Sequence, residues 1–103
     1  MIPQYEPLFD DKELRAAYEY MASDGWLTEH KLTTKLEKML CDYLGVKHCV
    51  MMPNGTLALY AALMTLHVGF CDWVIIPGFT MIATANAVAM ANAFPCFTDI
   101  ATS

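Results

Sequence analysis

The chain has 103 residues, a hydrophobic fraction of 56% and a formal net charge of −5 at pH 7. A chain of this length forms one domain or part of one, and the absence of a basic stripe argues against nucleic acid as a partner. Asp72 is the single charged residue between positions 48 and 98. Because apolar segments must be buried against something, residues 48–98 are predicted to form the interior of a larger body.

A first helix is predicted after an extended lead-in of nine residues that contains two prolines. Either Asp10 or Asp11 can cap this helix, and apolar residues recur at helical spacing up to about Ala22. Ser23-Asp24-Gly25 is expected to stop it. A short segment, residues 26–28, then leads to a second helix.

A second helix is predicted over residues 31–44, where apolar residues again recur at helical spacing. Gly45 follows as its C-terminal stop, because glycine adopts the left-handed conformation that ends many helices. The two helices together make residues 1–47 a charged helical N-terminal segment.

The period of the apolar residues changes after residue 47. Residues 48–103 are predicted to be an apolar segment in which strands and helices alternate in the order β-α-β-α-β. Strands of this kind form a mostly parallel sheet joined by crossovers, so the fold class is α/β. The predicted strands are residues 48–52, 73–76 and 95–98, and the predicted helices are residues 56–66 and 81–91.

An uncharged stretch, residues 74–98, is long enough to span a bilayer. Pro77-Gly78, Asn86, Asn92 and Pro95 divide it into pieces too short to span as one helix, so no membrane insertion is expected. The N-terminus has no basic start followed by an apolar core and does not resemble a signal peptide. A cytoplasmic location is therefore expected.

The cysteines show no metal-binding pattern. They form no C-x-x-C pair and have no ligand-like spacing to the histidines, and each lies in an apolar neighbourhood where a thiol packs as a small hydrophobe. Neither a metal site nor a disulfide is expected. The four cysteines are Cys41, Cys49, Cys71 and Cys96.

The most informative stretch is the turn Asn54-Gly55-Thr56 between an apolar run and an Ala/Leu-rich helical run. The first N–H groups of the helix have no partner within it, and the positive end of the helix dipole favours an anion. Gly55 permits close approach of the backbone, and the Thr56 hydroxyl adds a donor. The turn is a candidate phosphate site, although Asn and Thr are also ordinary N-cap residues.

A second turn, Pro77-Gly78-Phe79-Thr80, is predicted to lie beside the first. Ligands of parallel α/β sheets bind at the carboxyl ends of the strands, and both turns follow a predicted strand. This placement favours a ligand site over a plain helix cap. The first turn is neither a Walker A loop nor a Gly-x-Gly-x-x-Gly dinucleotide turn.

Five short sequence segments occur in a particular order and at a particular spacing. Each segment alone is a weak signal, but their order and spacing together are specific. They are Asp24-Gly25-Trp26-Leu27-Thr28, Lys35-Leu36-Glu37, Asn54-Gly55-Thr56-Leu57-Ala58-Leu59, residues 72–87 and residues 93–100. In them the chain resembles the N-terminal part of the pyridoxal-phosphate-dependent nucleotide-sugar aminotransferases of the DegT/StrS family, which include perosamine synthases. The resemblance covers nearly the whole chain. It implies an incomplete, N-terminal part of a fold-type I aminotransferase large domain.

The resemblance also implies cofactor-binding roles for Gly55, Thr56 and Met81. In this family the turn that matches Gly55-Thr56 holds the phosphate of pyridoxal phosphate, and the residue that matches Met81 lies against the pyridine ring. The family position is usually aromatic, whereas a thioether contacts a ring without stacking on it as a flat surface. Met81 can equally be a core residue at a helix start.

No catalytic residue is predicted in this chain. Transamination needs a lysine that binds the cofactor covalently and a carboxylate that pairs with its ring nitrogen. The resemblance implies that both lie beyond residue 103, and that Asp72 and Asp99 match structural positions. None of the lysines matches the catalytic one; they are Lys12, Lys31, Lys35, Lys38 and Lys47.

The resulting hypothesis is a fragment or truncated member of this aminotransferase family, inactive as an isolated chain. Full-length relatives are expected to transfer an amino group from an amino acid such as glutamate to a keto sugar nucleotide, in amino-sugar or polysaccharide biosynthesis, and to form homodimers. Two alternatives stay open. One is a non-catalytic module that binds a phosphate-bearing ligand or pairs with a chain supplying the missing half, and the other is the product of a decayed gene.

Overall fold

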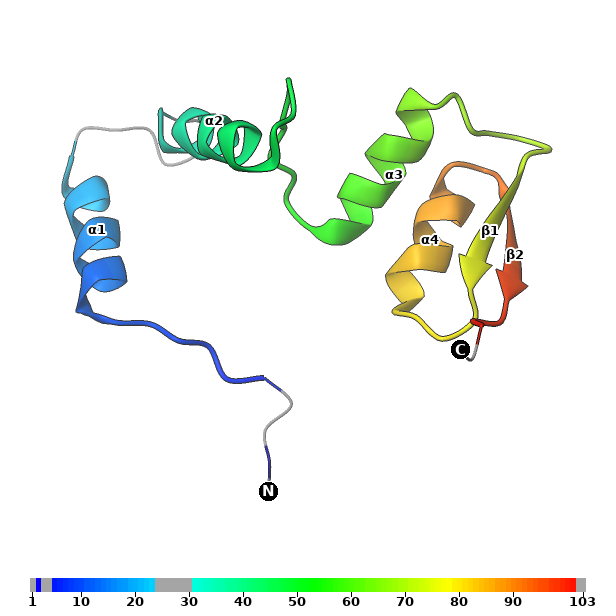
Figure 1. Cartoon of the computed structure of the whole chain (residues 1–103), viewed down its shortest axis with the longest axis horizontal. Helices are drawn as coiled ribbons and strands as arrows, with labels where there is room; N and C mark the ends of the chain where they lie inside the picture. Colours follow the sequence, from blue (N-terminus) through cyan, green and yellow to red (C-terminus); the bar gives the residue numbers. More distant parts are fainter. Residues whose placement is uncertain (1, 3–4, 24–30, 102–103) are drawn as a thin grey trace. The chain divides into compact units, whose positions relative to one another are not determined.

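The computed structural model describes residues 2, 5–23 and 31–101 (Figure 1). Contacts within the chain divide it into two compact units, Met1–Val50 and Met51–Ser103. The first unit contains two helices, and the second contains two helices that alternate with two strands. The second unit carries both candidate turns.

Helix α1 (Asp11–Ala22) begins where the sequence predicts a cap. The Asp10 carboxylate accepts a hydrogen bond from the Lys12 N–H at 2.7 Å, and the Glu13 carboxylate accepts one from the Asp10 N–H at 2.9 Å. This reciprocal arrangement is a capping box, which satisfies N–H groups that have no partner inside the helix. Ser23 is the C-terminal cap, so the predicted bounds of this helix are confirmed.

Helix α2 (Lys31–Leu44) also has its predicted bounds. Gly45 adopts a left-handed conformation with φ of 67°, and the Val46 N–H donates to the Cys41 carbonyl at 3.1 Å. This bond closes the last turn in the manner of a Schellman motif, which confirms Gly45 as the stop. Residues 24–28, which were expected to complete the first stop and the short connecting segment, lie outside the described residues.

The predicted strand at residues 48–52 is wrong. These residues form no regular element, and the side chain of Val50 is 74% exposed. A strand is stabilised by hydrogen bonds and side-chain packing with a neighbouring strand, so an apolar run by itself does not make one. In the described part of the chain the sheet contains two strands, and residues 48–52 pair with neither.

The second unit follows the predicted order of elements after that point. Each predicted boundary agrees with the structure to within one residue, which confirms the α/β class for this unit. Its elements are α3 (Gly55–Thr65), β1 (Trp73–Pro77), α4 (Ile82–Met90) and β2 (Phe94–Thr98).

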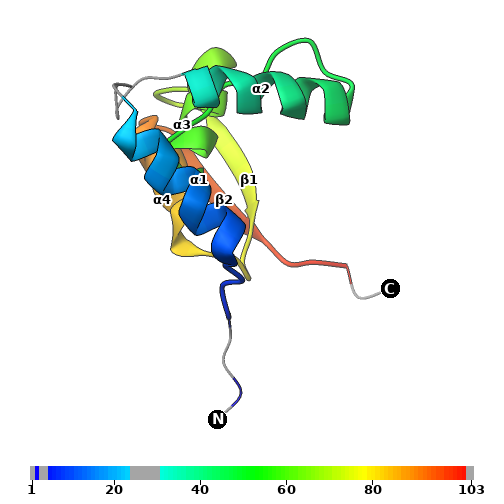
Figure 2. The same ribbon diagram turned by 90° about the vertical axis from the view of Figure 1, so that its left-hand side faces the viewer.

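Strands β1 and β2 are parallel, as expected, and run side by side in both views (Figure 1, Figure 2). Their register pairs Trp73 with Phe94 at one end and Pro77 with Thr98 at the other. The Gly78 N–H continues the ladder by donating to the Thr98 carbonyl at 2.8 Å. A Cβ at Gly78 would lie 3.4 Å from that carbonyl oxygen, an ordinary van der Waals distance, so packing does not require glycine there.

Asp72 organises the turn that leads into β1. Its carboxylate accepts the Gly69 N–H at 2.8 Å, and its own N–H donates to the Gly69 carbonyl at 3.0 Å. The Asp72 carbonyl accepts the Phe94 N–H at 2.8 Å. The single charged residue between positions 48 and 98 therefore has a structural position.

Helices α3 and α4 both end at a non-glycine residue in the left-handed conformation. His67 follows α3 and Asn92 follows α4, each with φ of 58°. After His67 the Val68 N–H donates to the Leu63 carbonyl at 3.0 Å, which closes the helix end, and an equivalent bond closes α4.

The core of the second unit is small and lies between α4 and one face of the sheet. Ile76 of β1 is 4% exposed and Val88 of α4 is 2% exposed. Alanines allow the helix to approach the strands closely. The buried residues are Ile76, Ala87, Val88, Ala91 and Ala93, and those packed around them are Leu63, Val68, Val74 and Ala85.

Many large apolar side chains remain outside this core. Phe70, Trp73, Ile75 and Phe79 are all exposed. An exposed apolar surface of this kind fits the expectation that residues 48–98 belong to the interior of a larger body.

Candidate functional site

The first half of the site is the start of α3. Asn54 caps this helix with its side-chain oxygen, which accepts the Leu57 N–H at 3.0 Å. The first intrahelical bond runs from the Ala58 N–H to the Asn54 carbonyl at 3.1 Å. The N–H groups of Gly55 and Thr56 therefore precede the hydrogen-bonded ladder and have no acceptor within the helix.

The space beside Gly55 is open. No atom of the chain lies within 4 Å of the position where a Cβ on Gly55 would stand, and its φ lies outside the left-handed range. Neither packing nor backbone conformation therefore requires glycine here. The missing side chain leaves room for a group from outside the chain to approach the backbone.

The second half of the site is the start of α4. Met81 is the N-cap residue of this helix and provides no side-chain hydrogen bond to it. Its side chain is 76% exposed, as are several other large apolar side chains of this unit, so the cofactor contact and the core position at a helix start both stay predictions. The hydroxyls of Thr80 and Thr84 lie 3.0 Å apart and share a hydrogen bond beside it.

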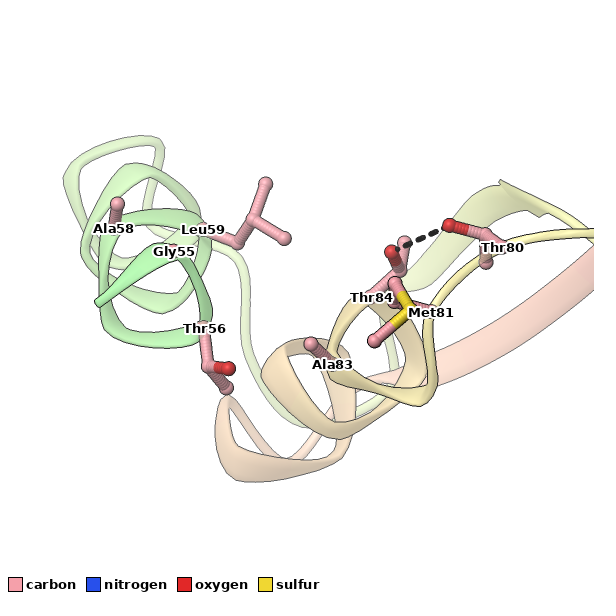
Figure 3. Close-up of a pocket in the computed structure, with 8 residues that line it drawn as sticks. All are labelled: Gly55, Thr56, Ala58, Leu59, Thr80, Met81, Ala83 and Thr84. Carbon is pink, nitrogen blue, oxygen red and sulfur yellow. Dashed lines mark hydrogen bonds between the residues drawn. The ribbon is translucent and has the colours of Figure 1, made fainter. Parts of the chain in front are cut away.

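These two helix starts line one pocket of about 670 Å³. Residues of α3 lie on one side, and Thr80 with the first residues of α4 lies on the other (Figure 3). Gly55, Thr56 and Met81, the three predicted site residues, all contribute to its lining. The others are Ala58, Leu59, Thr80, Ala83 and Thr84.

The lining holds no titratable side chain. Its polar features are three threonine hydroxyls and the free N–H groups at two helix starts, where the helix dipoles concentrate positive potential. Such a pocket suits an anion with an apolar body attached. Among the described residues the pKa shifts lie elsewhere: hydrogen bonds with the Glu13 side chain and the Lys12 N–H lower the pKa of Asp10, and desolvation raises that of Cys41.

Sequence reasoning did not single out Thr80 and Thr84 as site residues. They stand four positions apart across the start of α4, so their side chains share one helix face, and this spacing was a usable signal. Their hydroxyls add polar groups opposite Thr56.

Two features are absent from residues 2, 5–23 and 31–101. Among them no helix is long and apolar enough to cross a membrane. In the same residues no three His, Cys, Asp or Glu side chains come together as a possible metal site.

With this geometry established, comparison with known proteins identifies the chain's relatives. A family model matches residues 9–103, nearly the whole chain. The chain belongs to the DegT/DnrJ/EryC1/StrS aminotransferase family. The predicted resemblance is thereby confirmed. Aminotransferases of this family depend on pyridoxal phosphate (PLP), so the predicted cofactor is confirmed at the level of the family.

The relatives are sugar aminotransferases. GDP-perosamine synthase from Vibrio cholerae is 36% identical over 101 residues, which are 97% of this chain and 27% of that protein. A UDP-2-acetamido-2-deoxy-3-oxo-D-glucuronate aminotransferase from Pseudomonas aeruginosa is 49% identical over 67 residues, which are 65% of this chain and 19% of that protein. The chain thus spans about a quarter or less of the length of these relatives.

Solved structures agree with this placement. A Streptococcus pneumoniae protein assigned as a sugar aminotransferase, solved in PLP, PMP and apo forms, matches with a TM-score of 0.90 and 31% identity. The match covers 97% of this chain and 25% of that one. An aminotransferase from Psychrobacter cryohalolentis matches with a TM-score of 0.85 over 92% of this chain and 24% of its own. These matches confirm the predicted partial aminotransferase fold.

Proposed function

We propose that residues 1–103 form the N-terminal part of a PLP-dependent aminotransferase that acts on a nucleotide-linked keto sugar. One observation carries the proposal: the adjacent residues Gly55 and Thr56 line one pocket with Met81, which lies far from them in the sequence, at two helix starts. Membership of the family supports amino-group transfer. The GDP- and UDP-linked sugars in the names of its relatives support a nucleotide sugar as the substrate.

The residues present fit the phosphate end of the cofactor. The Gly55 and Thr56 N–H groups and the Thr56 hydroxyl can donate hydrogen bonds to a phosphate placed over the start of α3. The open space beside Gly55 allows the close approach that these bonds need. A hydrogen bond from Thr56 to such a charged group contributes about 1.5 to 3 kcal/mol.

The apolar part of the lining fits the remainder of the cofactor. Met81 is exposed into the pocket region, and its thioether can contact the face of a pyridine ring. When bound, PLP supplies the electron sink that amino-group transfer requires. This chain's own contribution is to bind and orient it.

Catalysis would need groups that this pocket lacks. No lysine and no carboxylate belongs to its lining, so we infer that the 103-residue chain does not catalyse transamination by itself. Glutamate as amino donor, a homodimeric assembly, a cytoplasmic location and a role in amino-sugar or polysaccharide biosynthesis are part of the same proposal for the complete enzyme.

Ligand titrations of the 103-residue chain test the proposal. Phosphorus NMR and calorimetry would compare PLP, inorganic phosphate and pyridoxal, which lacks the phosphate. We expect PLP to bind, phosphate to bind more weakly at the same site, and pyridoxal not to bind measurably, because the phosphate supplies the contacts to α3. Equal binding of PLP and pyridoxal, or no binding of PLP by a folded chain, would contradict the proposal.

A further inference from the structure

Helix α4 begins without a side-chain cap. Met81 occupies the N-cap position, and its side chain makes no hydrogen bond to the helix. By contrast, Asp10 caps α1 and Asn54 caps α3, each with a side-chain oxygen that accepts a backbone N–H. Such a cap satisfies one of the N–H groups that have no partner at a helix start. The methionine therefore occupies a position where the helix itself favours Ser, Thr, Asp or Asn.

A hydrogen bond between two threonines spans this cap position instead. Thr80 directly precedes Met81, and Thr84 is the third residue of α4. Their hydroxyl oxygens lie 3.0 Å apart and face each other (Figure 3). The Thr84 N–H also donates to the Met81 carbonyl at 3.0 Å, so a backbone turn closes at the same place. We call the bond between the Thr80 and Thr84 hydroxyls the threonine clasp.

Packing within the second unit does not hold the segment that leads into α4. Phe79 is 92% exposed and Met81 is 76% exposed. Hydrogen bonds hold the segment at both ends. Before Phe79, the Gly78 N–H donates to the Thr98 carbonyl of β2 at 2.8 Å, and after it the threonine clasp joins the segment to α4. The direction in which the Met81 side chain leaves the backbone therefore depends on these hydrogen bonds.

The pocket has two halves of different chemistry. Gly55 and Thr56 at the start of α3 offer N–H groups to an anion, and the half formed by α4 contains Met81 together with Thr80 and Thr84. In the proposed function the first half binds the phosphate and the second contacts the ring. A change confined to the threonine clasp should therefore alter the half that contacts the ring and leave the phosphate half as it is.

We propose that the threonine clasp positions Met81 for contact with the cofactor ring. Thr80 and Thr84 are positioning residues, because they act through the start of α4 and through the methionine between them. The clasp takes over the role of a helix cap, which leaves the cap position itself to a side chain that contacts the ligand. This inference rests on the proposed function for the identity of that ligand.

Removal of the two hydroxyls, singly and together, tests the proposal. Thr80→Val, Thr84→Val and the double variant keep the shape of the side chains and lose the bond. We expect the affinity for PLP, measured by calorimetry, to fall about threefold to tenfold in each variant. The affinity for inorganic phosphate should change by less than about twofold, because its contacts lie on α3. The double variant should lose no more than either single one, since all three lack the same bond.

Two kinds of control separate the clasp from general effects of the substitutions. Thr80→Ser and Thr84→Ser retain the hydroxyl and should bind PLP like the original chain. Thr65→Val removes a hydroxyl that donates to the Ala62 carbonyl at 2.8 Å in α3, at a position that does not line the pocket. This variant should also bind PLP normally. The helix content of every variant, measured by circular dichroism, should match that of the original chain.

A measurement without ligand tests the clasp independently of the proposed function. The methyl carbon of Met81 would be observed by NMR in a chain with labelled methionines and assigned from its loss in Met81→Leu. We expect this resonance to move toward that of an unrestrained methionine in the two single valine variants. It should keep its position in the serine variants and in Thr65→Val.

Four outcomes would overturn the proposal. They are unchanged PLP binding in the valine variants, an equal loss of phosphate and PLP binding, single effects that add in the double variant, and an unchanged Met81 resonance. Additive effects would mean that the two hydroxyls contact the ligand separately. If PLP fails to bind a folded chain but the Met81 resonance moves as expected, the result contradicts the proposed function and supports the clasp.

Discussion

At the scale of single residues, the fold does not require glycine at position 55, whereas binding of the proposed ligand does. Nothing in the chain occupies the space where its side chain would be. The Gly55→Val variant should therefore fold normally but bind phosphate or PLP at least about tenfold more weakly, since a branched side chain blocks approach to the α3 N–H groups. Phosphorus NMR titration would measure the change.

Thr56→Ser is the control for this prediction. Serine keeps the hydroxyl, so binding should fall less than in Gly55→Val. If Gly55→Val binds as well as the original chain, the turn is an ordinary N-cap and its open space has no role in binding.

Asp10 provides a prediction about pH. Hydrogen bonds with the Glu13 side chain and from the Lys12 N–H lower its pKa below the ordinary value of 3.8. A carboxyl group whose folded pKa is depressed stabilises the fold above its unfolded value, and this contribution is lost as the pH falls through the folded value. The start of α1 should therefore fray below about pH 3.8, which the Lys12 amide shift would report in an NMR titration.

The Asp10→Asn variant is the matched comparison. Asparagine caps helices about as well as aspartate and does not titrate in this range. Acid fraying of α1 in this variant should therefore be smaller. An unchanged acid transition would contradict the role assigned to Asp10.

At the scale of elements, the backbone at the end of α3 is strained, and this strain can be tested. His67 adopts φ of 58°, a conformation that costs an L-residue other than Gly or Asn about 1 kcal/mol. His67→Gly should slow hydrogen exchange of the Val68 amide, which closes this helix end, by up to about fivefold if that amide exchanges by local opening. Native-state exchange measured by NMR would give the change.

Asn92→Gly at the end of α4 is the comparison for this prediction. Asn92 has the same φ of 58°, but asparagine tolerates the left-handed region better than histidine. The effect on the Ala93 amide should be smaller than that on Val68. A larger effect at Asn92 would contradict the strain assigned to His67.

The elements also show which sequence signals are local. The capping box of Asp10 and Glu13 at the start of α1, and the stop at Gly45 after α2, depend on atoms within a few residues of each helix end. These helix ends could therefore be predicted from the sequence. Residues 48–52 have the composition of a buried strand but no strand partner in the described chain. Their failure as a strand shows that pairing, which joins distant segments, is not contained in an apolar run.

At the scale of the whole molecule, the chain is proposed to bind the cofactor without carrying the residues that react with it, and this gives a further prediction. None of the five lysines belongs to the pocket lining, so borohydride reduction of the chain mixed with PLP should attach no cofactor stoichiometrically to any one lysine. Peptide mapping by mass spectrometry would check this. A single lysine modified in full would show that the chain carries more of the catalytic apparatus than we propose.

The amino-acid sequence by itself determined the helices, their ends, strands β1 and β2 to within one residue, and the α3 turn as a candidate anion site. It also carried the family resemblance. These features depend on periodicity, caps and backbone preferences, all of which act over a few residues.

Only the tertiary structure decided that Met81 and Thr56 line one pocket, that Thr80 and Thr84 join them, and that α4 packs against the sheet through Val88 and Ile76. Each of these facts depends on how segments that are distant in the sequence pack together, which local propensity does not encode.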